Sequence, residues 1–134
     1  MATTVPKLVW FVFVITVLLE GFAGVVFVID PFAESMEGIV QGKAEISYTY
    51  GLAILPLLFA TFVAIASSLA GQGVTPLIPV LCGWLGYHVG IIAWAYVVRG
   101  GLADIYTIHG VMLSLTVLAL LSSFSASSTK QKAN

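Results

Sequence analysis

Residues 77–98 read LIPVLCGWLGYHVGIIAWAYVV. The stretch contains no charged residue and is long enough to cross a bilayer as one helix, which takes about 20 residues at 1.5 Å each. It nevertheless carries His88 near its centre. Hydrocarbon offers no hydrogen-bond partner, so an imidazole at that depth must be paired with another polar group or wetted by a cavity. The stretch therefore poses two questions: which fold buries it, and what His88 contacts.

The composition of the chain places this stretch in lipid. The chain has 134 residues, of which 60% are hydrophobic and only 8% are charged, whereas soluble domains carry about 25% charged residues. Three further apolar runs of spanning length occupy residues 8–29, 50–70 and 102–124. The first run is longer than the roughly 7–15 apolar residues of a signal peptide, so we expect a retained helix. The sequence predicts one transmembrane domain over 1–134, an all-α antiparallel four-helix bundle.

The connections between the runs predict the topology. The segment 30–49 is the longest and holds most of the acidic residues, and its middle, FAESMEGIV, predicts a short interfacial helix. Glycines and Pro76 break the chain between the second and third runs, and a tight turn at 99–101 joins the third and fourth. Three lysines lie near the termini, and one lysine and one arginine lie in the opposite loops. Because Lys and Arg favour the cytoplasmic side, we expect both termini there; the sequence leaves open which membrane this is.

Ionisable residues inside the runs are the strongest functional signal. With antiparallel helices, Glu20 and His88 fall within about 3 Å of the same depth, near the bilayer centre. His109 falls about 7–8 Å nearer the outer side, and Arg99 and Asp104 lie at the outer interface. A carboxyl at the bilayer centre costs about 2.5–3.5 kcal/mol, and such groups usually face the bundle interior or a cavity. We expect a Glu20–His88 pair that titrates as a unit, binding a ligand or relaying protons with His109.

Each of these residues also has a purely structural interpretation. On that interpretation, Glu20 and His88 would hold neighbouring helices together through hydrogen bonds, His109 would lie at the membrane interface, and Arg99 and Asp104 would form a surface pair.

Trp84 shares a helix face with His88 at i, i+4 and could contact a flat ligand. Five glycines predict close helix packing, at Gly21, Gly24, Gly83, Gly86 and Gly90. The single Cys82 is expected to be an unreactive thiol.

Several chemistries find no support in the sequence. There is no phosphate loop, CxxC, HExxH or GxSxG motif, and no basic patch for nucleic acid. No residue is predicted to be catalytic. Counted from the turn at 99–101, His88 and His109 are about four residues out of register, or some 6 Å. This offset disfavours a haem held between the two histidines, and it disfavours a metal site made by both histidines and Glu20.

Two segments resemble the DoxX-like four-helix membrane proteins and their small relatives. They are VIDPF at residues 28–32, followed by an acidic loop, and AEISYTYGLAILPL at residues 44–57. In the second segment Glu45, Tyr50 and Gly51 resemble the entry to helix 2 in those relatives. The resemblance implies a four-helix bundle that serves as an accessory subunit near redox or quinone chemistry. It supplies no catalytic residue, and neither histidine maps to a pattern of that family.

The sequence leaves three functions open. The first is a small non-enzymatic accessory or scaffold subunit that binds a hydrophobic ligand, quinone or lipid, or partner helices. The second is a proton-coupled carrier or proton-conducting element that uses Glu20 and His88. The third is a subunit of a quinone- or haem-dependent membrane oxidoreductase. The expected partners are the lipid bilayer and either other membrane subunits or further copies of the chain.

Overall fold

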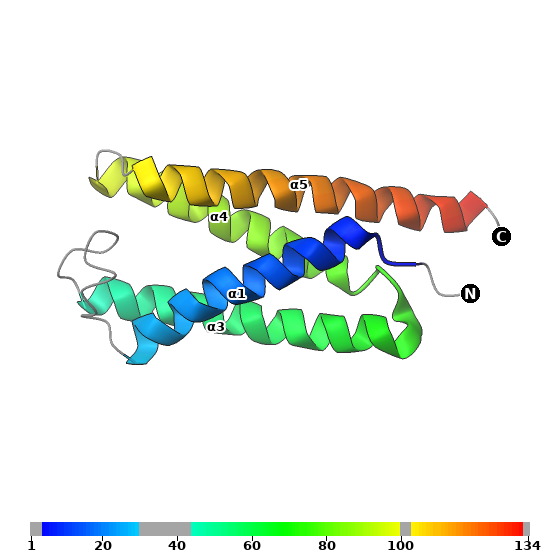
Figure 1. The fold of residues 1–134 in the computed structure, drawn as a ribbon, viewed down its shortest axis with the longest axis horizontal. Helices are drawn as coiled ribbons and strands as arrows, with labels where there is room; N and C mark the ends of the chain where they lie inside the picture. Colours follow the sequence, from blue (N-terminus) through cyan, green and yellow to red (C-terminus); the bar gives the residue numbers. More distant parts are fainter. Residues whose placement is uncertain (1–3, 30–43, 100–102, 133–134) are drawn as a thin grey trace.

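The computed structural model describes residues 4–29, 44–99 and 103–132. Over these residues the chain forms the helices α1 (Lys7–Ile29), α3 (Ala44–Ser67), α4 (Leu77–Arg99) and α5 (Ala103–Lys132), with a short π-helix, η1 (Ser68–Gln72), after α3. The long helices run up and down in turn, so that α1 begins and α5 ends at the same end of the bundle (Figure 1). The predicted all-α four-helix fold is confirmed.

The outward face of the bundle is apolar. Each long helix contains a stretch apolar enough to span a membrane, at Lys7–Val25, Leu52–Gln72, Leu77–Val97 and Tyr106–Ser128, and no more than 33% of any stretch is buried inside the bundle. Large apolar side chains such as Leu18, Phe22 and Phe59 are exposed instead. Water-soluble proteins rarely expose apolar surface on this scale. The chain is therefore an integral, multi-pass membrane protein.

The four helices form a closed ring in which α1 packs on α3, α3 on α4, α4 on α5, and α5 on α1. The main apolar core lies mainly in the half of the ring nearest the termini and includes Phe13, Leu81 and Trp84. A smaller apolar core, built on Ile91 and Ala95, lies further along α4. Residues 87 and 88 of α4 lie between these two cores, so any polar group that they contact is enclosed on both sides.

Helix ends differ from the sequence expectation in two places. Helix α3 begins at Ala44, not at residue 50, and α5 continues to Lys132, beyond the predicted end of the fourth run at residue 124. The tail is rich in Ala, Ser, Lys and Gln, which tolerate a helix well, and Ser125 and Ser128 donate hydrogen bonds to carbonyls four residues back. The interfacial helix expected between 30 and 43 lies outside the described residues.

The turn after η1 depends on glycine. Gly71 and Gly73 have φ angles of 99° and 69°, a region of backbone conformation that residues with a Cβ rarely adopt. Pro76 then precedes the first residue of α4, where its missing N–H costs no helical hydrogen bond. The predicted break between the second and third runs is therefore confirmed.

The five packing glycines fall into two groups. A Cβ on Gly24 would lie 2.9 Å from Ile54 Cγ2, and one on Gly83 would lie 2.8 Å from Leu57 Cδ2. Gly21 also faces α3, through Leu58. In contrast, Gly86 and Gly90 are exposed, and a Cβ on either would meet nothing within 4 Å among the described residues. Close packing inside the chain thus involves Gly21, Gly24 and Gly83, which face α3, and not Gly86 and Gly90.

Candidate functional site

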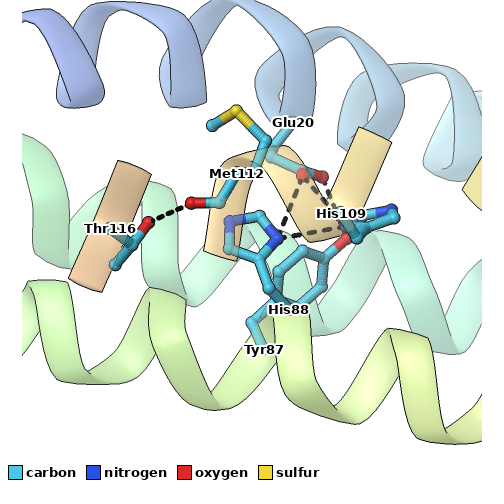
Figure 2. Close-up of polar contacts among 6 residues, drawn as sticks. All are labelled: Glu20, Tyr87, His88, His109, Met112 and Thr116. Carbon is cyan, nitrogen blue, oxygen red and sulfur yellow. Dashed lines mark hydrogen bonds and ion pairs between the residues drawn. The ribbon is translucent and has the colours of Figure 1, made fainter. Parts of the chain in front are cut away.

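Four polar side chains from three helices meet between the two apolar cores. Glu20 comes from α1, Tyr87 and His88 come from α4, and His109 comes from α5, and we call this group the polar cluster. Figure 2 shows the four side chains converging from their helices. The group joins α1 to α4 across the ring, although neighbouring helices make most of the bundle's contacts.

Glu20 and His88 of the polar cluster lie on the buried stripes of their helices. On α4 the buried positions Leu77, Leu81, Trp84, His88, Ile91 and Ala95 recur at spacings of three and four, which is the period of one helix face. Glu20 continues the stripe of Phe13 and Thr16 on α1. The hydropathy pattern does not reveal these stripes, because the lipid-facing positions are as apolar as the buried ones.

The contacts within the cluster are short. The Tyr87 hydroxyl donates a hydrogen bond to Glu20 Oε2 at 2.9 Å, and His88 Nδ1 lies 3.1 Å from His109 Nδ1. The other carboxylate oxygen, Glu20 Oε1, lies 3.8 Å from His88 Nδ1 and 3.7 Å from His109 Nδ1. The two Glu20 oxygens therefore have separate roles. One is held by Tyr87, and the other faces both histidines.

The cluster is buried to different depths. The side chain of His88 is 0% exposed and that of Glu20 is 5% exposed, while that of His109 is 15% exposed. Among the described residues, the buried Nε2 of His88 has no hydrogen-bond partner. An unpaired buried donor or acceptor costs about 1–3 kcal/mol, so the fold holds this ring in place at a cost. Of the two histidines, His109 is therefore the one whose side chain a ligand can reach.

Aromatic side chains fix the orientation of the His88 ring. Trp84 stacks on it with ring centroids 6.1 Å apart and an angle of 27°, as their i, i+4 spacing predicted. The Trp84 indole is itself held, since its Nε1 donates to Thr61 Oγ1 at 2.9 Å. Tyr87 meets both imidazoles edge-on, at 5.3 Å from His88 and 5.9 Å from His109. The imidazoles therefore lie among rigid rings.

The predicted contact between Glu20 and His88 is present, with Glu20 Oε1 3.8 Å from His88 Nδ1. The predicted offset of about 6 Å between the histidines is wrong, because their Nδ1 atoms lie 3.1 Å apart. The count assumed that both helices leave the turn at one depth, but α5 begins inside the end of α4 (Figure 1). The side chains of Arg99 and Asp104 lie outside the described part of the chain.

Tyr87 was missed by the sequence reasoning, although a signal existed. It precedes His88 in the chain, so its hydroxyl falls near the depth of the Glu20 carboxyl, which needs a donor. The two imidazoles contact each other directly through their Nδ1 atoms, 3.1 Å apart, so a haem could enter between them only after the two histidines separate.

Two apolar grooves flank α5. The α1/α5 groove has a volume of about 290 Å³ and is lined by Ile15, Leu19, Thr107, Ile108, Val111, Met112 and Leu115. Leu19 and Ile108 directly precede Glu20 and His109 in the chain, and Met112, which also lines the groove, is buried. The second groove, of about 450 Å³, lies between α4 and α5 and includes Tyr106. The α1/α5 groove is thus lined by residues that are adjacent in sequence to two members of the polar cluster.

Comparison with protein-family models, curated proteins and solved structures found no match for this chain. The resemblance to DoxX-like proteins therefore remains a prediction from the sequence. The fold and the polar cluster together define a small multi-pass membrane protein with a buried polar centre.

Proposed function

We propose that this membrane protein binds an amphipathic ligand of the quinone class. Its polar head would contact the polar cluster, and its apolar tail would lie in the α1/α5 groove. The observation that carries the proposal is the position of this groove, whose lining residues Leu19 and Ile108 directly precede Glu20 and His109 in the chain. Ligand sites in membrane bundles combine an apolar cavity with a few convergent polar groups, and the two features meet here.

The chemistry of the cluster suits a quinone head. Quinone carbonyls accept hydrogen bonds, and quinols donate them. Imidazole nitrogens do either, according to the tautomer, and a tyrosine hydroxyl does both. Met112 lines the groove one helical turn from the partly exposed His109, so rotation of the unbranched Met112 side chain would widen the groove toward His109. Trp84, stacked on His88, would lie close to a bound ring.

This position makes Trp84 fluorescence a test of binding, because quinones quench tryptophan. In a Trp10→Phe, Trp94→Phe background, Trp84 is the remaining tryptophan of the chain. We expect decylubiquinone to quench it saturably in mild detergent. Val111→Phe, which fills the groove, should weaken binding on the order of tenfold, equivalent to about 1.4 kcal/mol.

Val117→Phe is the matched control, because Val117 lies on the same helix, is exposed and does not line the groove. It should leave the dissociation constant unchanged. Quenching that rises linearly with quinone, to the same extent in all three proteins, would mean partitioning into detergent and would contradict the proposal. A role as an accessory subunit beside a larger redox protein, which the DoxX-like resemblance implies, is compatible with such a site.

A further inference from the structure

The geometry points to a transition-metal site made by Glu20, His88 and His109, with Zn²⁺ as the simplest ion to fit. This inference goes beyond quinone binding and does not depend on it. One carboxylate oxygen and two imidazole nitrogens face one another across three helices, and the set lies within 4.8 Å. Two histidines with one glutamate form a known ligand set of catalytic zinc sites.

The distances within the set match the size of an ion. The three sides of the triangle are 3.1, 3.7 and 3.8 Å long. The centre of the circle through the three atoms lies about 2.1 Å from each, and bonds from Zn²⁺ to histidine nitrogen and carboxylate oxygen measure about 2.0–2.2 Å. An ion would therefore reach all three atoms with little movement of the helices. Three ligands leave a fourth tetrahedral position for an external ligand.

The surroundings of the three ligands also suit a metal. Tyr87 holds Glu20 through Oε2, which leaves Oε1 directed at both histidines. Such hydrogen bonds from outside the ligand set fix the orientation of a ligating carboxylate. Trp84 and Tyr87 restrain the His88 ring through stacking and edge contacts. The fold thus holds all three ligand atoms on rigid helices before any ion binds, and it leaves the buried His88 Nε2 unpaired in doing so.

Titration with Co²⁺ tests the site directly, because tetrahedral Co²⁺ absorbs visible light and free Co²⁺ does so only weakly. Tag-free protein in mild detergent, stripped with a chelator, should bind one Co²⁺ per chain, and Zn²⁺ should displace it. Glu20→Gln and His109→Gln should each abolish the visible band. Tyr87→Phe should keep the stoichiometry and weaken affinity about 10–100-fold, as is typical when a partner of a ligand is lost.

Ser114→Ala is the control, since Ser114 lies on α5 and is exposed; it should bind Co²⁺ as the wild type does. His109→Cys guards against variants that merely fail to fold, because a thiolate ligand should add an intense near-ultraviolet band. Absence of a visible band in the wild-type protein would overturn the inference, as would an unchanged band in both Gln variants. The titration contains no quinone, so its failure would leave the quenching experiment unaffected.

Discussion

At the scale of residues, Glu20 shows how the chain makes a carboxyl tolerable inside a membrane. A buried polar group without a partner loses its hydration and gains nothing in return. Glu20 avoids this loss because Oε2 accepts the Tyr87 hydrogen bond and Oε1 faces two imidazoles. The same contacts hold α1 against α4 and α5, so the polar cluster contributes to the packing of the bundle as well as to any ligand site.

The Tyr87 hydrogen bond should be measurable as stability. Tyr87→Phe removes the donor and leaves Glu20 Oε2 buried with one partner fewer. Hydrogen bonds between membrane helices contribute on average about 0.6 kcal/mol, and a buried acceptor left unpaired costs about 1–3 kcal/mol. We therefore expect the free energy of unfolding in detergent to fall by about 1 kcal/mol. Tyr96→Phe, at a side chain that is 73% exposed on the same helix, should have no effect, and an equal loss in both variants would contradict this account.

At the scale of elements, the α1–α3 contact depends on small residues. Helices approach closely in lipid where glycine leaves the backbone uncovered. Gly24 faces Ile54, whose β-branched side chain is stiff, and a Cβ would come within 2.9 Å of its Cγ2. Gly83 faces the end of the flexible Leu57 side chain, which can rotate away. The two glycines are therefore not equivalent, although the sequence presents both simply as glycines in helices.

Alanine substitutions should rank these positions. Gly24→Ala should destabilise the bundle by about 1–3 kcal/mol, the usual cost of overpacking. Gly83→Ala should cost less, because Leu57 can move. Gly86→Ala should be neutral or slightly stabilising, since its added Cβ meets nothing among the described residues and alanine favours a helix. Thermal unfolding in detergent measures all three. If Gly86→Ala were the most damaging, its face would have to pack against a second chain.

The sequence predicted the elements better than their contacts. Four apolar runs were enough to locate the helices, because a bilayer fixes the length of any element that spans it. The Glu20–His88 contact also followed, since two polar groups at one depth need each other. The position of His109 did not follow, because it depends on where α5 begins relative to α4. The sequence also did not reveal which glycines pack against another helix, because hydropathy does not distinguish a lipid-facing position from a buried one.

At the scale of the whole molecule, the chain passes along the bundle an even number of times, so both ends of the described chain and the turn between α3 and α4 lie at the same end of the bundle. Helix α1 begins there, η1 turns there, and α5 ends there (Figure 1). The polar cluster lies further along the bundle, beyond the main apolar core, which lies mainly in the half nearest this end. A ligand or ion would therefore reach the cluster more directly from the lipid-facing α1/α5 groove, or from the opposite end, than through the end that holds the termini.

Cysteine accessibility can establish this topology in intact membranes. Starting from Cys82→Ala, which removes the single cysteine, one new cysteine is placed at Gln72, Ser128 or Ser35. Gln72→Cys and Ser128→Cys should react from one side of the membrane, because η1 and the end of α5 share one end of the bundle (Figure 1). Ser35→Cys, in the segment between α1 and α3, should react from the other side.

The lysines near the termini predict that Gln72 and Ser128 face the cytoplasmic side, so a membrane-impermeant maleimide added outside should label Ser35→Cys alone. Labelling of Ser35→Cys and Ser128→Cys from the same side would refute four spans. Labelling of Ser128→Cys alone from outside would keep the four spans and invert the orientation.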